Sequence, residues 1–408
     1  MEKQKSATKT RNSNNTGHVR LKRNGLWEGQ YWWEGKRKSV YGRSEEECRG
    51  KLNGILADIY KGSYINGSTM PFYAYLKWYQ KNCTNTRPST QDNYDTYFDG
   101  HIFHSRLGSI ALKDLARDDF NAFFKEKRNS GRLDGKPGGL KPKTLRNVKN
   151  ALSQALDYAV NVKRFIPYNP LTGFEIKVPR PRIETLSTSE FCRLEKTIFR
   201  YEDINALMTL IDLYAGPRVG ELCALTWSDF GFNKAYFEIN YTLERLSKKY
   251  ADQAPEFIKI EIANSKEDAK TALYLGPPKT EESRRKIYTN KVTVCAFELI
   301  EQYQKEHGLY KPDGFVFVQR NGNPIEPRAY QKLHRKIMAS AEVTYRKFHT
   351  MRHTFASRAV ELHVDIGTLS EILGHAQKST TLNMYDHSRE ELKKQAMQSF
   401  NQLNSDTI

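Results

Sequence analysis

The alternation of polar and apolar positions divides the first sixty residues into three short strands and one helix. β-prone runs over residues 18–41 are separated by Asn24-Gly25 and Glu34-Gly35, which are typical hairpin turns. Ser44 and three following glutamates then favour the positive end of a helix, whose apolar face is Leu52, Ile55, Leu56 and Ile59. The pattern predicts a small sheet backed by one helix over residues 18–65, after a disordered basic leader at residues 1–17.

Residues 72–175 show helical periodicity, after a linker rich in Gly, Ser and Asn that ends at Pro71. The clearest apolar face lies between residues 144 and 162, and comprises Leu145, Val148, Leu152, Leu156, Ala159 and Val160. A glycine-rich basic loop at residues 131–142 precedes this helix, and four prolines between 167 and 181 mark a second linker. We expect an all-α domain between the two linkers.

Residues 185–390 mix helices with short strands. Helices are expected at residues 190–200 and 204–215 and again after residue 292, and strands at 235–243, 258–262, 272–275, 285–288 and 315–317. The charged stretch 244–270 predicts a surface insertion in the sheet. The expected fold class is therefore multidomain: a three-stranded β-sheet plus helix, an all-α domain, and a mainly-α domain with a small antiparallel sheet (α+β). A polar tail, residues 391–408, follows.

Composition narrows the function classes. The 408 residues hold 65 Lys and Arg against 47 Asp and Glu, for a formal charge of +18, which indicates a polyanionic partner or simply a basic protein. Five widely spaced cysteines argue against a disulfide framework and a zinc–thiolate site, and fit a reducing compartment. No apolar run approaches the ~18 residues of a membrane span, and the polar N-terminus lacks a secretory signal.

The chemistry-bearing residues fall in four C-terminal motifs. They are Gly216-Pro-Arg218-Val-Gly-Glu221-Leu, a turn lysine at Lys279, His349-x-x-Arg352-His353, and Leu373-Gly-His375 followed ten residues later by Tyr385. Two guanidinium groups and a lysine suit a phosphate, because arginine donates in a fixed fork and lysine can also give up a proton. Surrounding cations stabilise a tyrosine anion and so promote its attack on a phosphodiester. Such a pocket needs neither a metal ion nor a nucleotide cofactor.

Each motif taken alone has a simpler interpretation. An arginine before Gly-Glu-Leu is usually structural, Lys279 could be a solvated turn residue, and His375 could be stabilised by a helix C-terminus. His349 and His353 have the spacing of a zinc metalloprotease, but Thr350 stands where that motif has its glutamate. Tyr385 is one of 23 tyrosines. The order of the four motifs along the chain and the sequence around each of them together favour the catalytic interpretation over these simpler ones.

Taken together, the motifs resemble those of the tyrosine recombinases, the lambda-integrase family. The resemblance covers roughly residues 185–390, and the whole layout is similar to integrases of conjugative transposons and phages of Gram-positive bacteria. Those proteins have an arm-type DNA-binding domain, a core-binding domain and a catalytic domain, which would correspond to residues 18–65, 72–175 and 185–390.

The resemblance implies a role for each matched residue. Tyr385 would attack the scissile phosphate and become linked to its 3′ side, while Arg218 and Arg352 would hold the non-bridging oxygens. Lys279 would protonate the departing 5′ oxygen. The remaining implied roles are proton transfer by His349, a phosphate contact by His375, orientation of the catalytic groups by Glu221, and a structural role for His353.

The resemblance also implies partners. Members act as homo-tetramers on paired double-stranded DNA attachment sites through a Holliday junction, in the bacterial cytoplasm and bound to the nucleoid. An excision factor and a host DNA-bending protein are further partners left open, no membrane is involved, and no cofactor is needed. The tail after Asp386 would pack on a neighbouring subunit. Two features depart from the family pattern: Pro217, where an aliphatic residue is usual, and the long insertion at residues 244–270, which we expect to touch DNA or a partner subunit.

Predicted DNA contacts outside the catalytic motifs depend mostly on the family layout. They are Arg20, Lys22, Trp32, Arg37 and Lys38 on the N-terminal sheet, and Lys141 and Lys143 in the helical domain. The simpler interpretation is that the tryptophans form a small core and the lysines a solvated face.

Three alternatives to an integrase remain at this point. A type IB topoisomerase shares much of the active-site chemistry, although the N-terminal module and Leu373-Gly-His375 favour recombination. A chromosome-dimer-resolving recombinase is usually shorter and lacks that module. A catalytically inactive DNA-binding regulator would not need the complete set of catalytic residues.

Overall fold

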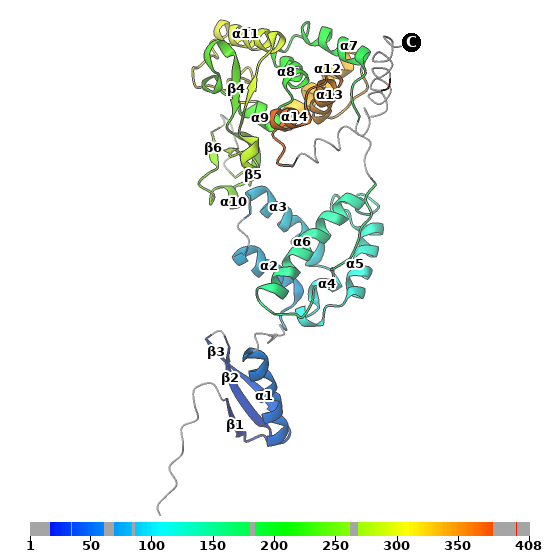
Figure 1. Cartoon of the computed structure of the whole chain (residues 1–408), viewed down its shortest axis with the longest axis vertical. Helices are drawn as coiled ribbons and strands as arrows, with labels where there is room; N and C mark the ends of the chain where they lie inside the picture. Colours follow the sequence, from blue (N-terminus) through cyan, green and yellow to red (C-terminus); the bar gives the residue numbers. More distant parts are fainter. Residues whose placement is uncertain are drawn as a thin grey trace, which may run out of the picture. The chain divides into compact units, whose positions relative to one another are not determined.

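The computed structural model describes residues 17–33, 35–60, 69–83, 86–179, 184–261, 268–377 and 397 (Figure 1). The chain divides into two compact units, residues 1–85 with 93–178 and residues 86–92 with 179–408, and each is considered by itself. Tyr385 lies outside the described residues, as do all of the expected leader except Gly17 and most of the expected tail. Every helix in the described ranges is too short or too polar to cross a membrane.

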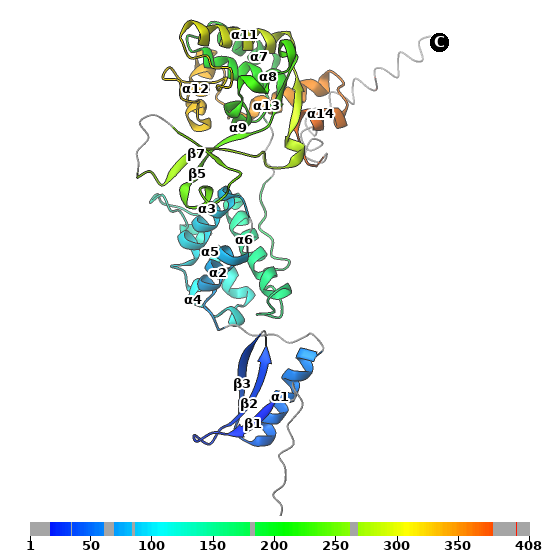
Figure 2. The same ribbon diagram turned by 90° about the vertical axis from the view of Figure 1, so that its left-hand side faces the viewer.

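The first unit begins with a three-stranded antiparallel sheet in the order β1-β2-β3. The strands are β1 (His18–Leu21), β2 (Trp27–Trp33) and β3 (Lys36–Gly42), and helix α1 (Glu45–Tyr60) covers one face (Figure 2). Tyr31 and Leu52 are the buried centre of this contact. The turn after β1 requires a positive φ, which Gly25 supplies at 78°. The predicted sheet-plus-helix arrangement is therefore present.

A helical assembly follows in the same unit. Its α-helices are α2 (Phe72–Cys83), α4 (Arg106–Ser109), α5 (Arg117–Ser130) and α6 (Pro142–Asn161), together with the part of α3 (Pro88–Tyr97) that begins at Asn93. Helix α6 buries Leu145, Val148, Leu152 and Leu156, the residues whose spacing predicted its apolar face. The predicted loop at residues 131–142 separates α5 from α6, and Pro142 begins α6, where a missing N–H does no harm.

The second unit is mainly helical with two small sheets. Its helices are α7 (Thr188–Ile198), α8 (Leu207–Ala215), α9 (Val219–Ala224), α10 (Lys248–Ala251), α11 (Lys291–Glu306), α12 (Pro327–Ser340), α13 (His349–Glu361) and α14 (Ile366–Leu373). Helix α8 packs against α7, α11 and α13, and every one of its residues except Tyr214 is buried. This central position gives α8 a rigid end from which the site can be built.

The strands of the second unit differ from the prediction. They are β4 (Tyr236–Ile239), β5 (Thr242–Ser247), β6 (Ile258–Ile260), β7 (Thr271–Gly276) and β8 (Arg285–Tyr288). The single strand expected at residues 235–243 is two, because β4 pairs with β8 whereas β5 pairs with β7. The expected strand at residues 315–317 is wrong: Phe315 makes only an isolated bridge to Thr226, and the side chains of Val316 and Phe317 fill the core instead.

The charged segment 244–270 is more than a surface insertion. It contributes most of β5, together with α10 and β6, and the sheet has the order β5-β7-β6. Leu246, Ala251, Phe257 and Tyr274 form a small buried cluster of their own beneath it. Leu246, Ala251 and Phe257 of this segment thus lie in one small core, whereas Ile258 is exposed.

We predict that Leu152→Ala destabilises the helical assembly by about 2–5 kcal/mol, because it leaves a cavity where a fully buried side chain stood. Denaturant unfolding followed by circular dichroism measures the change. Asn150→Ala, on the exposed side of the same helix, is the control and should shift the transition by less than about 0.5 kcal/mol. Equal losses in the two variants would contradict the assignment of the buried face.

Candidate active site

The site forms where two helices end in left-handed glycines. Gly216 ends α8 at φ 67° and Gly374 ends α14 at φ 61°. A Cβ atom added to Gly216 would lie 2.5 Å from the ring of Phe355, so the position also lacks space for a side chain. The carbonyl groups at these two ends have no partner within their helices and carry the negative end of each helix dipole. They therefore form a natural binding place for cations.

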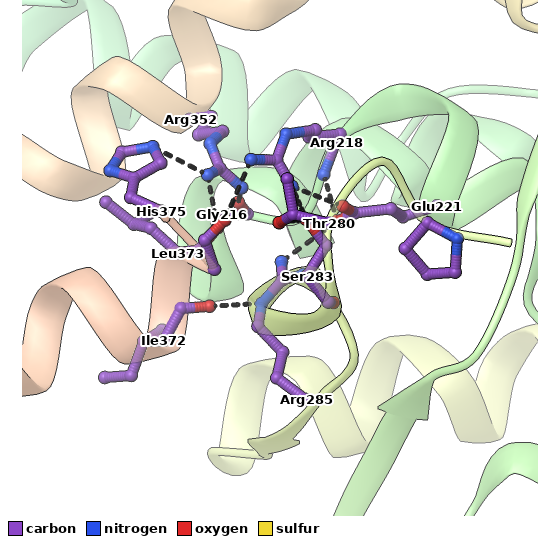
Figure 3. A network of polar contacts seen from close by, with 12 residues as sticks. Gly216, Arg218, Glu221, Thr280, Ser283, Arg285, Arg352, Ile372, Leu373 and His375 are labelled. Atoms are coloured by element: carbon purple, nitrogen blue, oxygen red, sulfur yellow. Dashed lines mark hydrogen bonds and ion pairs between the residues drawn. The ribbon is translucent and has the colours of Figure 1, made fainter. Parts of the chain in front are cut away.

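Arg218 is held by Glu221 and by the end of α14. Its Nη1 donates to Glu221 Oε1 at 2.6 Å and its Nη2 to the Gly374 carbonyl at 3.0 Å (Figure 3). The backbone N–H of Arg218 also donates to Glu221 Oε2, at 2.9 Å. The side chain remains 37% exposed, and its other N–H groups can still bind an anion.

Arg352, on α13, is 1% exposed and fixed by both helix ends. Its Nη1 donates to the Gly216 carbonyl at 2.6 Å, and its Nη2 to the Leu373 carbonyl and to His375 Nε2, the latter at 3.0 Å. Burial and the nearby charge of Arg218 lower the pKa of Arg352, but a guanidinium group remains charged at neutral pH. The positive charge of Arg352 is therefore buried and held in a fixed position at the bottom of the site.

Glu221 is the carboxylate between the arginines, and it is 3% exposed. Burial alone would raise its pKa, but Arg285, Arg218 and Arg352 together lower the pKa of Glu221 below its ordinary value. An ionised glutamate at this place offsets part of the repulsion among the guanidinium groups. Glu221 accepts hydrogen bonds from Arg218 and Arg285, and its orienting role in catalysis stays a prediction.

The histidines of the site are neutral at neutral pH. Burial, followed by His353 and Arg352, lowers the pKa of His349 to about 4, and burial with Arg352 and Arg218 lowers that of His375 to about 4. Because His375 Nε2 accepts from Arg352, the neutral ring carries its proton on Nδ1. The rings of His349 and His353 contact each other edge to face, with centroids 4.6 Å apart.

Of the two remaining predicted residues, only Lys279 belongs to the described part of the chain. Lys279 lies in the bend after β7 with its side chain exposed, and its turn joins the cluster through Thr280 and Ser283, whose hydroxyls are 3.2 Å apart. Ser283 Oγ in turn accepts from Arg218 Nη1 at 3.4 Å. Tyr385 lies outside the described residues, so its place in the site stays a prediction.

The sequence reasoning missed two buried charged residues. Arg285 donates to Glu221, to Ser283 and to Ile372. Asp212, on α8, is fully buried, and in the described part of the chain no donor reaches either carboxyl oxygen. Burial raises the pKa of Asp212 well above its ordinary value, against the opposing charge of Arg352. A fully buried acid in an apolar helix is a signal that the isolated polar position of residue 212 could have given.

The strand register sorts the residues predicted on the N-terminal sheet. Trp32 lies opposite Arg37, and Arg20 opposite Glu28, all on the face that points away from α1. Trp32 is 65% exposed there. Lys38 lies opposite Tyr31 and so belongs to the face that packs on α1.

Three other predicted lysines have the following places. Lys22, just after β1, is 3.9 Å from Glu28 and lies over the ring of Tyr41. Lys141 and Lys143 are exposed at the start of α6. Cations are unfavourable at this positive helix end, so an anionic partner would relieve them.

Comparison with known proteins places this geometry in context. Residues 190–391 match the model of the phage integrase family. A XerC-like tyrosine recombinase from Caldanaerobacter subterraneus subsp. tengcongensis is 26% identical over 384 residues, which cover 90% of this chain and 92% of that protein.

Two solved structures share the fold. The Tn1549 transposon integrase in complex with transposon right end DNA aligns with a TM-score of 0.62 at 21% identity, over 80% of this chain and all of that one. A lambda integrase tetramer bound to a Holliday junction aligns with a TM-score of 0.52 at 14% identity, over 92% of this chain and 96% of that one. At these identities, the likeness is one of fold.

We predict a loss of stability in mild acid. His334, His349 and His375 each have a folded-state pKa of about 4, against 6.5 in the unfolded chain. The folded state thus binds fewer protons, so the free energy of unfolding is at its full value above pH 6.5 and falls as the pH drops from 6.5 towards 4. Thermal unfolding between pH 4 and pH 8 measures this.

The variant His334→Gln isolates one contribution. It removes one buried titrating ring from the core, so the slope of the unfolding free energy against pH should decrease by about one proton between pH 6.5 and pH 4. An unchanged slope would mean that this histidine titrates alike in the folded and unfolded states.

Proposed function

This chain belongs to the phage integrase family, the tyrosine recombinases, and on that premise we propose that it is a site-specific DNA recombinase that integrates and excises a mobile element. The observation that carries the proposal is the pair Arg218 and Arg352. Both are held at the ends of helices, and Arg218 is also bound to Glu221. Two oriented guanidinium groups can hold the two non-bridging oxygens of one phosphodiester and stabilise the charge that grows on them during attack.

Arg218 and Arg352 take these oxygens in different ways. Arg218 is partly exposed and binds its oxygen directly. Arg352 is buried and already donates to His375, so it reaches its oxygen when the His375 ring moves from Arg352 to the phosphate. His375 Nδ1–H is then a donor to the same phosphate. Phosphate binding thus replaces a neutral partner of Arg352, the His375 ring, by an anionic oxygen, which complements the guanidinium charge better.

The first chemical step is attack by the Tyr385 oxygen on the phosphorus. The phenolic proton passes to His349, whose ring is neutral and can accept it because its pKa lies near 4 in the free protein and rises once the anionic phosphate is bound. The bond from phosphorus to the 5′ oxygen breaks, and Lys279 gives that oxygen a proton. The product is a 3′-phosphotyrosine and a free 5′ hydroxyl.

Strand exchange reverses this step on another DNA end. A 5′ hydroxyl attacks the phosphotyrosine, its proton returns to Lys279, and Tyr385 leaves with a proton from His349. One phosphodiester is exchanged for another, so no nucleotide triphosphate is consumed. The chemistry needs positioning and charge, which the arginine cluster provides.

The substrate is double-stranded DNA at attachment sites, in the bacterial cytoplasm. The formal charge of +18 supports a polyanion. Arg20, Trp32 and Arg37 lie on one open face of the N-terminal sheet, a face suited to a DNA groove. Lys141 and Lys143 at the start of α6 contact phosphates of the core site, and the sheet formed by residues 242–276 contacts DNA or a neighbouring subunit.

The active assembly is a homo-tetramer on two paired sites, which passes through a Holliday junction. The lambda integrase tetramer on such a junction, with the same fold, supports this arrangement. The residues after Asp386 pack on the neighbouring subunit and control which tyrosines are active. An excision factor and a host DNA-bending protein set the direction of the reaction.

We predict that Tyr385→Phe abolishes covalent protein–DNA adducts on a supercoiled plasmid that carries the attachment site. DNA binding in a gel-shift assay should stay within about threefold of wild type, because only one hydroxyl is lost. Tyr288→Phe, an exposed tyrosine of the same unit, is the matched control and should form adducts normally. Adducts in the Tyr385→Phe protein would show that another residue is the nucleophile.

Binding of arm-type DNA should depend on the open face of the N-terminal sheet. Arg37→Gln should weaken binding and reduce the slope of log K against log salt by roughly 0.9, the value for one phosphate contact. Arg49→Gln removes the same charge from α1 and should leave the slope unchanged. Equal slopes for both variants would place the DNA elsewhere.

A further inference from the structure

Arg285 contacts three segments that are far apart in the sequence. It is the first residue of β8, six residues after Lys279, and its side chain is 6% exposed. Nε donates to the Ile372 carbonyl at 2.6 Å, Nη1 to the Ser283 carbonyl at 2.9 Å, and Nη2 to Glu221 Oε2 at 2.9 Å (Figure 3). One side chain thus joins the Lys279 turn, the Arg218–Glu221 pair and the end of α14.

The surroundings of Arg285 differ from those of the phosphate-binding arginines. Each of its three nitrogens already donates to a protein acceptor, and it is far less exposed than Arg218. Its charge is balanced inside the protein by ionised Glu221 and by the carbonyl end of α14. Arg285 is therefore placed to hold protein segments together, and not to bind the substrate.

The contact with Ser283 reaches the lysine turn. The Ser283 carbonyl accepts from Arg285, while the Ser283 hydroxyl accepts from Arg218 and lies 3.2 Å from the Thr280 hydroxyl. Thr280 directly follows Lys279, so the C-terminal side of the turn is tied to the arginine cluster. The exposed Lys279 side chain can move, but the backbone that carries it has a fixed anchor.

We propose that Arg285 is a positioning residue that sets the Lys279 turn against the scissile phosphate. This inference rests on the proposed function, in which Lys279 protonates the leaving 5′ oxygen. Loss of the Arg285 guanidinium group releases Ser283 from Glu221 and from α14. Lys279 on the released turn then delivers its proton to the 5′ oxygen less often. A lysine cannot replace Arg285, because its three donors extend from one atom and cannot span acceptors on three segments.

A change of leaving group tests this directly. With a sulfur atom in place of the bridging 5′ oxygen, the phosphorus–sulfur bond breaks and a thiolate leaves without needing a proton. A defect that arises from poor delivery of that proton is therefore rescued by sulfur, whereas a defect in the arginine pair or in folding is not. The probes are two duplexes with the attachment site of the element that encodes the chain, one with the 5′ oxygen and one with the 5′ sulfur.

Arg285→Lys and Arg285→Gln should cleave the oxygen duplex about 10²-fold more slowly than wild type in a single turnover. On the sulfur duplex, the defect should shrink at least about tenfold, with the Kd for DNA close to wild type. Ser283→Ala, which removes one hydroxyl of the same connection, should show a smaller defect with the same rescue. Arg284→Gln, which removes the neighbouring exposed charge, should leave the ratio of the two rates unchanged.

An equal defect of the Arg285 variants on both duplexes would overturn the inference, as would rescue of Arg284→Gln. If the Arg285 variants unfold at a lower temperature, Ser283→Ala decides: the absence of rescue there also overturns it. Lys279→Ala tests the proposed function separately, because absence of sulfur rescue in that variant would remove Lys279 as the proton donor whatever the result for Arg285.

Discussion

Three guanidinium groups lie close together in the second unit, those of Arg285 and Arg352 buried and that of Arg218 partly exposed. The rest of the site depends on how their repulsion is offset. Removing even one such charge from water costs several kcal/mol after relaxation. The chain compensates with one buried carboxylate, Glu221, and with the carbonyl groups at the ends of α8 and α14. Gly216 and Gly374 make this possible, because their left-handed conformation ends each helix and leaves its carbonyls facing the arginines.

This arrangement prepares positive charge before any DNA arrives. The arginines are oriented by the protein, so the rearrangement proposed on phosphate binding is confined to the ring of His375. Burial, together with the positive charge of the neighbouring arginines, lowers the pKa of His349 and of His375 and keeps both rings neutral, which leaves His349 able to accept a proton and His375 able to donate one from Nδ1. Burial raises the pKa of Asp212 well above its ordinary value, which weakens its tendency to ionise beside Arg352.

The sequence predicted much of this but not the connections. Arg218, Glu221, Arg352 and His375 could be predicted because short motifs retain residue type and order, and the structure brings all four together. Arg285 could not, because its importance comes from three acceptors that meet only after folding. Helical periodicity predicted a helix and its buried face correctly where only one face of the helix is buried, as in α6.

The strands were harder to predict, because their pairing partners are not local. Nothing in residues 235–243 indicates that β4 and β5 pair with different strands. The charge of residues 244–270 hid a small apolar cluster, and the apolar residues 315–317 gave the pattern of a strand although they only fill the core. The place of Tyr385 stays a prediction made from its motif.

The central claim is that Arg218 and Arg352 act by neutralising the non-bridging oxygens of the attacked phosphate. The most direct measurement compares single-turnover cleavage of a normal duplex with one that carries an uncharged methylphosphonate at the scissile position. Arg352→Ala should be about 10²-fold or more slower than wild type on the normal duplex and should recover most of that loss on the neutral one, where an oxygen charge no longer needs compensation. An equal loss on both duplexes would contradict the account.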